Sequence, residues 1–250
     1  MLSKINIQDI VTISKEAGDA IMQVYNQDFE VEYKKDSSPL TLADKKANDI
    51  IEDGLNQLSV NFPILSEEGK EISYEDRKHW EYFWLVDPLD GTKEFVKKND
   101  EFTVNIALIH KDTPVLGVVY APALDVCYWA KQGRGAFKDG QKLPLKIAVQ
   151  RSTYKIVASR SHMSDETQEF IDAIDTSKEK DLISIGSSLK ICLVAEGEAD
   201  IYPRLGLTME WDTGAAHAII KESGKSIQGY ETPLFLYNKK SLLNSWFITL

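Results

Sequence analysis

The chain has 250 residues, of which 43% are hydrophobic and 27% are charged, and its formal net charge at pH 7 is −10. These values are typical of a globular protein with one large domain or two small ones. The acidic balance argues against a general binder of nucleic acid or of membrane surfaces, since both functions need a basic face. An anionic substrate remains compatible with it where local cations or bound metal ions reverse the field.

Neither a membrane span nor an export signal is visible in the sequence. No stretch approaches the ~20 apolar residues that cross a bilayer, and the first residues, MLSKINIQDIVTI, lack a signal-peptide profile. Cys127 and Cys192 lie far apart without metal-ligand spacing, as buried thiols in a reducing compartment do. We expect a cytoplasmic protein. Peripheral association with the inner membrane leaves no signal in the residues, and neither a monomer nor a homodimer is favoured.

The first half of the chain predicts two helices and then a run of strands. Apolar residues recur at spacings of three and four over residues 5–26 and again over residues 42–58. Apolar runs rich in β-branched and aromatic residues then predict strands at 62–65, 82–86, 102–109, 115–120 and 126–131. Asp139-Gly140 carries the signal of a tight hairpin turn.

The second half alternates strands and helices. Strands are predicted at 155–159, 182–185 and 199–202. Ser164 is expected to cap one helix, Ser187 a second that ends near Gly197, and Asp212 to open a third that runs to Glu222. An α+β half followed by an alternating α/β half predicts two layered subdomains, residues 1–148 and 149–250, joined near 146–154.

Acidic residues stand at the ends of predicted elements in four separate places. They are Asp44 in PLTLAD, Glu67 and Glu68 in ILSEEG, Asp87 and Asp90 in VDPLDGT, and Asp212 in MEWDTG. Each has an ordinary structural explanation. Thr41 and Asp44 match a capping box, Asp90 and Asp212 suit simple N-caps, and Glu67-Glu68-Gly69 suits a solvated turn.

The joint pattern favours a metal site over these separate explanations. Asp87 follows an apolar strand, where uncompensated charge is expensive. Pro88 stiffens the loop and leaves the Leu89 carbonyl free, while Gly91 permits close backbone approach and Thr92 begins a turn whose N–H groups suit a phosphate. Hard oxygen ligands without nearby histidine or cysteine favour Mg²⁺ over Zn²⁺. Several carboxylates meeting at one point would hold two or more such ions, as phosphoryl transfer requires.

These motifs resemble those of the inositol-monophosphatase superfamily of Mg²⁺-dependent, lithium-sensitive phosphatases. WLVDPLDGTKEF and WDTGAAHAII carry the resemblance, PLTLAD and ILSEEG support it, and it covers nearly the whole chain. It implies an α/β (α+β) fold, a layered α/β/α/β/α sandwich. Most metal ligands would lie in the first subdomain and the elements of substrate specificity in the second.

Further motifs are similar to those of 3′(2′),5′-bisphosphate nucleotidases of the CysQ type within that superfamily. They are Lys93-Glu94-Phe95, SRSH (159–162), GSSLK (186–190), LVAEGEADIYPR (193–204) and MEWDTGAAHA (209–218). The implied substrate is a small nucleotide of sulfur metabolism, adenosine 3′,5′-bisphosphate, which is hydrolysed to AMP and phosphate. Adenosine 3′-phosphate 5′-phosphosulfate is an implied second substrate. One departure is Leu207 after Gly206, where relatives often have proline.

The resemblance assigns a role to each matching position. Two or three Mg²⁺ ions would be held by Glu67, Asp87, the Leu89 carbonyl, Asp90 and Asp212. Asp44 and Thr92 would orient and deprotonate the attacking water. The residues expected to contact the substrate are Glu67, Leu89, Asp90, Gly91, Thr92, Ser159, His162, Ser188, Lys190, Arg204 and Asp212. Lys190 and Arg204 suit the second phosphate of a bisphosphate, although solvated surface charges are their alternative explanation.

The mechanistic hypothesis is direct attack of a metal-activated water on the 3′-phosphate, without a phosphoenzyme. An inositol or sugar monophosphatase is the nearest alternative, and Lys93-Glu94, Lys190 and Arg204 weigh against it. A non-catalytic phospholigand-binding protein on the same scaffold is a second alternative, although every metal ligand and both water-activating residues are present. A structural domain without a site would require four independent coincidences.

Overall fold

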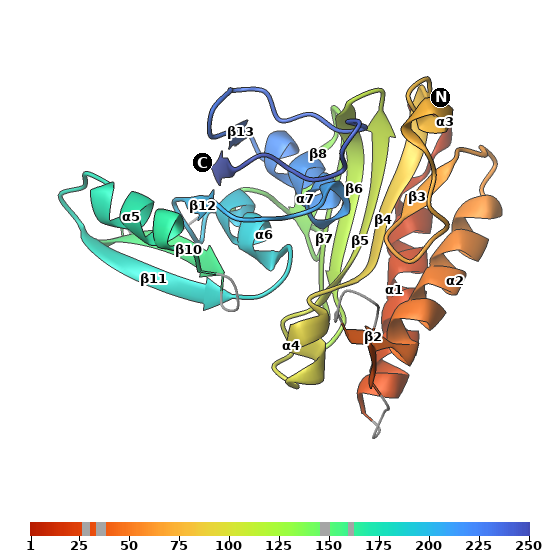
Figure 1. The fold of residues 1–250 in the computed structure, drawn as a ribbon, viewed down its shortest axis with the longest axis horizontal. Coiled ribbons are helices and arrows are strands. Elements are labelled where there is room, and N and C mark those ends of the chain that lie inside the picture. The colour runs from red at the N-terminus through yellow and green to blue at the C-terminus, as the bar shows by residue number, and fades with distance from the viewer. Residues whose placement is uncertain (27–30, 34–38, 146–150, 160–162) are drawn as a thin grey trace.

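Five layers alternate helix, sheet, helix, sheet and helix in a computed structural model of the chain (Figure 1). The structure describes residues 1–26, 31–33, 39–145, 151–159 and 163–250. The first layer consists of the helices α1 (Ile7–Tyr25) and α2 (Leu42–Asn56), and a short 3₁₀ turn at Leu2–Lys4 precedes α1. The layering confirms the fold class that the resemblance implies.

The central element is a seven-stranded sheet that follows α2 in the chain. Its strand order is β3-β4-β5-β6-β7-β8-β9, and every neighbouring pair is antiparallel except β3 and β4, which are parallel. The strands are β3 (Ile64–Ser66), β4 (Tyr82–Asp90), β5 (Thr103–His110), β6 (Thr113–Ala121), β7 (Val126–Lys131), β8 (Gly135–Lys138) and β9 (Gln141–Lys142). Asp139 and Gly140 have positive φ between β8 and β9, which confirms the predicted hairpin turn.

Strand β4 is buried on both faces of this sheet. Trp84 and Val86 pack with the residues of α1 and α2, whereas Phe83 and Leu85 pack on the opposite side with residues of the middle helices. Successive side chains of a strand point to opposite faces, so an unbroken apolar run is what a doubly covered strand requires. The charges of Asp87 and Asp90 are thereby confined to the end of β4.

The middle layer consists of α6 (Leu189–Glu196) and α7 (Glu210–Glu222). Helix α7 lies close to β6 because Gly117 has no side chain; a Cβ there would lie 2.1 Å from the carbonyl oxygen of Ala215. Gly197, with φ of 87°, ends α6 as predicted. The predicted cap of α6 is wrong by one residue, since Ser188 is the N-cap and Ser187 precedes it with φ of 50°.

The second sheet lies beyond the middle helices. Strands β10 (Thr153–Ser159) and β11 (Glu179–Ile185) are parallel, and a bridge between Ile156 and Ile201 links β10 to a sheet of order β12-β14-β13. The last layer is α5 (Asp165–Ala173), which Ser164 caps as predicted by accepting a hydrogen bond from the N–H of Thr167. The strands of the smaller sheet are β12 (Tyr202–Arg204), β13 (Ile227–Gly229) and β14 (Phe247–Thr249).

The remaining elements are short. They are α3 (Tyr74–Arg77), α4 (Thr92–Val96), β1 (Val31–Tyr33) and β2 (Pro39–Thr41). None of the described helices is both long and apolar enough to cross a bilayer. One buried cluster contains residues from both halves of the chain, including Leu65, Tyr128, Val157 and Phe247. Residues 146–150 of the junction predicted near 146–154 lie outside the described residues, and the division into residues 1–148 and 149–250 stays a prediction.

Candidate metal and phosphate site

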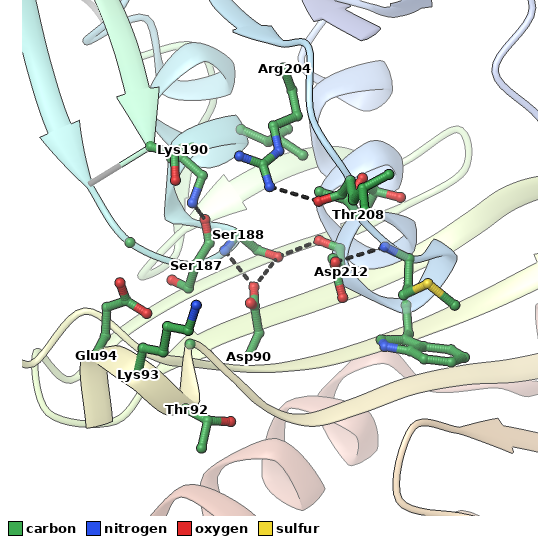
Figure 2. Close-up of a pocket in the computed structure, with 18 of the residues that line it drawn as sticks. Asp90, Thr92, Lys93, Glu94, Ser187, Ser188, Lys190, Arg204, Thr208 and Asp212 are labelled. Atoms are coloured by element: carbon green, nitrogen blue, oxygen red, sulfur yellow. Dashed lines mark hydrogen bonds between the residues drawn. The ribbon is translucent and has the colours of Figure 1, made fainter. Parts of the chain in front are cut away.

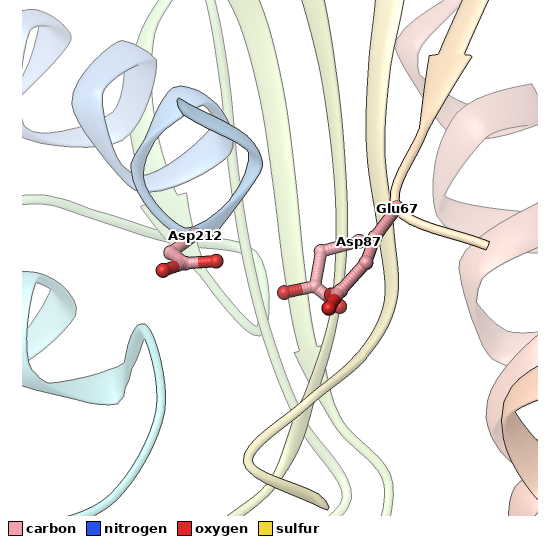
Figure 3. Close-up of side chains that lie close together, drawn as sticks. All are labelled: Glu67, Asp87 and Asp212. Carbon is pink, nitrogen blue, oxygen red and sulfur yellow. The ribbon is translucent and has the colours of Figure 1, made fainter. Parts of the chain in front are cut away.

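Three of the predicted metal ligands lie together. Glu67, Asp87 and Asp212 each offer a carboxylate oxygen, and these oxygens all lie within 4.8 Å of one another (Figure 3). The parallel pairing of β3 with β4 aligns Ser66 with Val86, which places Glu67 next to Asp87. Asp212 lies in the first turn of α7, which packs on the face of the sheet opposite α1 and α2. Acids 145 positions apart in the chain (212 − 67) therefore meet at one point.

The electrostatics of this cluster call for a cation. Burial raises the pKa of Asp87 well above its usual range, and the charges of Glu67, Asp90, Asp212 and Asp44 raise it further. Burial also raises the pKa of Asp212, followed by the charge of Asp90. When ionised, carboxylates that converge in this way repel one another, and either a proton or a bound cation relieves the repulsion. Because the cluster supplies only hard oxygen donors, it fits a divalent cation of the Mg²⁺ type.

Asp90 belongs to a different set of contacts. Its Oδ2 accepts hydrogen bonds from the backbone N–H of Ser188 at 2.7 Å, from the Ser188 hydroxyl at 2.8 Å, and from the side-chain amide of Asn105 at 3.3 Å (Figure 2 shows the first two). Burial raises the pKa of Asp90, while Lys190 and then these hydrogen bonds lower it. The side chain is thus fixed in place from the neighbouring strand and from the start of α6.

The loop between β4 and α4 has the predicted shape. The N–H of Leu89 donates to Oδ1 of Asp87 at 3.1 Å, and the Thr92 hydroxyl donates to the Leu89 carbonyl at 3.4 Å. Gly91 adopts φ of 92°, and a Cβ there would lie 3.2 Å from the Glu101 carbonyl oxygen. Only glycine accepts both the left-handed backbone and the close approach without strain.

Two of the ordinary structural explanations are wrong. The N-cap of α4 is Gly91 and not Asp90. The N-cap of α7 is Met209, so that Asp212 is the third residue of the helix and accepts a hydrogen bond from the Met209 N–H at 2.8 Å. Asp44 is buried in the first turn of α2, near enough to Asp87 to affect its pKa. The capping box between Thr41 and Asp44 involves a side chain outside the described part of the chain.

A cavity of about 370 Å³ opens over the acids. It collects most of the residues that the sequence assigns to substrate. Those that line it are Glu67, Asp90, Gly91, Thr92, Ser159, Ser188, Lys190, Arg204 and Asp212. Asp44, Asp87 and Leu89 are buried and do not line it, and His162 lies outside the described residues. Most of the residues predicted to contact the substrate therefore lie at one cavity. The two most buried acids, Asp44 and Asp87, do not reach its surface.

Lys190 and Arg204 form the cationic wall of this cavity (Figure 2). Burial lowers the pKa of Lys190 to about 8, which Asp90 opposes, and its Nζ donates to the Ser187 carbonyl at 2.6 Å. Arg204 is 7% exposed and donates to the Leu207 carbonyl at 2.7 Å. That burial is incompatible with a solvated surface charge at Arg204. Because Leu207 contributes a backbone carbonyl, the contact does not depend on its side chain.

The sequence did not identify three residues of this region. Lys93 and Glu94 line the cavity, whereas their motif indicated the type of enzyme without a role for either side chain. Asn105 lies under the site on β5, opposite Asp87 in the register. The available signal was one polar residue inside the apolar run FTVNIALI, which predicts a strand without indicating what the amide contacts.

Comparisons with known proteins agree with this geometry. The family model described as "Inositol monophosphatase family" matches residues 3–246. A Salmonella typhimurium protein named 3′(2′),5′-bisphosphate nucleotidase CysQ is 46% identical over 96% of this chain and 98% of the relative, and an Escherichia coli protein of the same name is 45% identical over the same shares. The crystal structure of CysQ from Bacteroides thetaiotaomicron superposes with a TM-score of 0.87 at 44% identity, covering 98% of this chain and 96% of that one.

The match in sequence and in fold therefore covers nearly the full length of the chain. By family model, sequence and structure alike, the chain belongs to the inositol monophosphatase family.

Proposed function

We propose that the protein is a Mg²⁺-dependent 3′(2′),5′-bisphosphate nucleotidase that hydrolyses adenosine 3′,5′-bisphosphate to AMP and phosphate. One observation carries the proposal: a three-carboxylate cluster and the cationic side chains of Lys190 and Arg204 lie at the same cavity. The relatives that match nearly the whole chain at 43–46% identity are named for this activity. A monophosphate substrate would lack the second phosphate that the cationic wall suits.

The carboxylate cluster and the cationic wall suit different phosphates of the substrate. The carboxylates, together with bound cations, suit the phosphate that is cleaved, whereas Lys190 and Arg204 suit the other phosphate. The cavity volume lies within the range typical of small-molecule sites. Adenosine 3′-phosphate 5′-phosphosulfate presents anionic oxygens at the same end, so it is the proposed second substrate. The ligand is thus a small nucleotide and not a nucleic acid.

The metal ligands of the proposal are Glu67, Asp87, the Leu89 carbonyl, Asp90 and Asp212, which would hold two or three Mg²⁺ ions. When bound, Mg²⁺ lowers the pKa of the attacking water and neutralises charge on the leaving 3′-oxygen. In the reaction a bond forms between the water oxygen and phosphorus while the bond to the 3′-oxygen breaks, so no phosphoenzyme arises.

The chain's own groups position the reactants. Asp44 and Thr92 would orient the water and accept its proton, and the Thr92 hydroxyl is already directed at the Leu89 carbonyl. The backbone of Gly91 and Thr92 would hold the scissile phosphate. Among the described residues that line the cavity there is no cysteine or histidine, which agrees with direct attack by water.

The test is phosphate release from adenosine 3′,5′-bisphosphate, AMP and inositol 1-phosphate, each with Mg²⁺ and with a chelator. We expect the bisphosphate to be hydrolysed fastest and the chelator to abolish release. Asp87→Asn and Asp212→Asn should each lower turnover by about a hundredfold or more. Asp19→Asn, an exposed aspartate on α1, is the matched control. Faster release from inositol 1-phosphate, or near-normal turnover of Asp87→Asn, would overturn the proposal.

A further inference from the structure

One oxygen of Asp90 has its hydrogen-bonding capacity filled by protein groups. Oδ2 accepts from the Ser188 N–H, the Ser188 hydroxyl and the Asn105 amide at 2.7, 2.8 and 3.3 Å. An ionised carboxylate has about four acceptor sites over its two oxygens, so three donors on one oxygen leave no lone pair there for a metal ion. These contacts leave Oδ1 as the oxygen that can face a cation.

The Ser188 hydroxyl is also fully engaged. It accepts a hydrogen bond from the Asn105 amide at 2.9 Å, and its single proton has two acceptors, Oδ2 of Asp90 at 2.8 Å and the Asp212 carbonyl at 2.6 Å (Figure 2). Donation to a charged oxygen is the stronger of the two. Since Ser188 is 3% exposed, a nucleotide would have to displace one of these partners to reach the hydroxyl.

Asn105 is the less expected member of this group. It is 1% exposed on β5, and both of its contacts are acceptors, which requires the NH₂ to face them. Its Oδ1 is buried without a hydrogen-bond partner in the described part of the chain. Burial of an unsatisfied acceptor destabilises the folded state. An apolar residue would avoid that cost at a strand position flanked by Val104 and Ile106, so the two donated bonds account for the asparagine.

We propose that Asn105 and Ser188 are positioning residues that fix Asp90 so that it binds a metal ion through Oδ1 alone. The proposal rests on the proposed function for the presence of the metal, and it assigns the Ser188 hydroxyl to Asp90 instead of to the nucleotide. The contacts join β4, β5, α6 and α7, so the same three side chains also hold the metal-binding loop against the helix that carries Lys190.

The experiment measures Mg²⁺ binding to the nucleotide-free protein by titration calorimetry, in wild type, Ser188→Ala and Asn105→Asp. The first variant removes one oxygen, and the second keeps the shape of the side chain but replaces the donor with an acceptor. Groups that orient a metal ligand typically contribute ten- to a hundredfold to affinity, so we expect Mg²⁺ to bind about tenfold more weakly or worse in both. Ser187→Ala, which lies in the same loop without a contact to Asp90 in the structure, should bind Mg²⁺ as wild type does.

Kinetics provides the second readout. The Mg²⁺ concentration for half-maximal rate should rise by the same factor, while KM for the bisphosphate at saturating Mg²⁺ should change by less than about threefold. A raised KM with unchanged Mg²⁺ affinity would mean that the hydroxyl contacts the nucleotide, and unchanged Mg²⁺ affinity in both variants would also overturn the proposal. If Asn105→Asp does not fold, Ser188→Ala decides alone. Because calorimetry needs no substrate, a wild type that failed to hydrolyse the bisphosphate would reject the nucleotidase and leave this result standing.

Discussion

The Nζ of Lys239 lies 2.6 Å from Oε1 of Glu210, a carboxylate with no exposed surface at the first position of α7. The same carboxylate accepts hydrogen bonds from the backbone N–H groups of Asn238 and Lys239 at 2.7 and 3.0 Å. Arg77 extends the network by donating to the Asn238 side chain at 2.7 Å. The start of α7, two residues before Asp212, is therefore anchored by a loop near the C-terminus.

Removing the lysine should destabilise the protein, because Glu210 would keep a buried charge with only two backbone donors. Lys239 is one-third exposed, so we expect Lys239→Met to lower the free energy of unfolding by about 1–3 kcal/mol, measured by urea denaturation. In a Glu210→Gln background the same change should cost less, since no buried charge is left to compensate. Additive costs in this double-mutant cycle would contradict the pairing.

Stabilisation by Mg²⁺ should grow as the pH rises. The folded-state pKa values of Asp87 and Asp212 are raised, so their contribution to stability is complete below about pH 3.8 and is lost as the pH rises through the folded pKa values. Mg²⁺ binds the charged forms and offsets that loss. The difference in Tm between protein with Mg²⁺ and protein with a chelator should therefore increase from about pH 5 to about pH 8, and Asp87→Asn should remove most of the increase. A difference independent of pH would argue against these acids as ligands.

His217 should make the fold sensitive to acid. Its Nδ1 lies 3.1 Å from the Tyr237 hydroxyl, and burial lowers its pKa to about 3 from 6.5. The unfolded chain then binds more protons between these two values, so stability falls as the pH drops from about 6.5 towards 3. We expect His217→Gln to lose less stability than wild type between about pH 7 and pH 5, by urea denaturation at each pH. His79→Gln, at an exposed histidine, should follow the wild-type dependence.

The approach of α7 to β6 should tolerate no side chain at Gly117. A Cβ there would lie 2.1 Å from the Ala215 carbonyl oxygen, a backbone atom that cannot rotate away. Gly117→Ala should cost about 3 kcal/mol of unfolding free energy and should weaken Mg²⁺ binding by shifting Asp212. Gly206→Ala is the matched control, because its Cβ would meet the Arg204 side chain at an ordinary 3.6 Å. Equal stability of the two variants would mean that the layers can separate without loss.

The sequence predicted the local elements well because their signals are local. Alternating and helical periodicities placed the long strands and helices, and Gly197 and Ser164 act as the terminators and caps that their residue types favour. The start of α7 was misplaced for a physical reason. Asp212 has the chemistry of an N-cap, but the helix begins earlier because Glu210 is held by residues 238–239, a contact that no local pattern contains.

The convergence of the acids was predictable where a motif marks them. The acids of VDPLDGT and MEWDTG stand at element ends, and three of the five proposed ligands converge as expected. The supporting contacts were not predictable from the same signals. Asn105 sits in an apolar strand, and its partner Ser188 is 83 positions further along the chain. Which polar residue of a buried strand supports a site depends on the pairing of strands and the docking of α6, and both are tertiary properties.

Because the middle helices are more deeply buried than the outer ones, the two kinds of helix should tolerate substitutions differently. Six of the eight residues of α6 are buried, whereas α1 buries nine of nineteen along one side. A saturation scan would therefore show tolerance rising and falling with each turn of α1 but staying low along the whole of α6. Natural drift and engineered diversity alike should concentrate in the outermost layers, and the core helix that presents Lys190 to the cavity should change slowest.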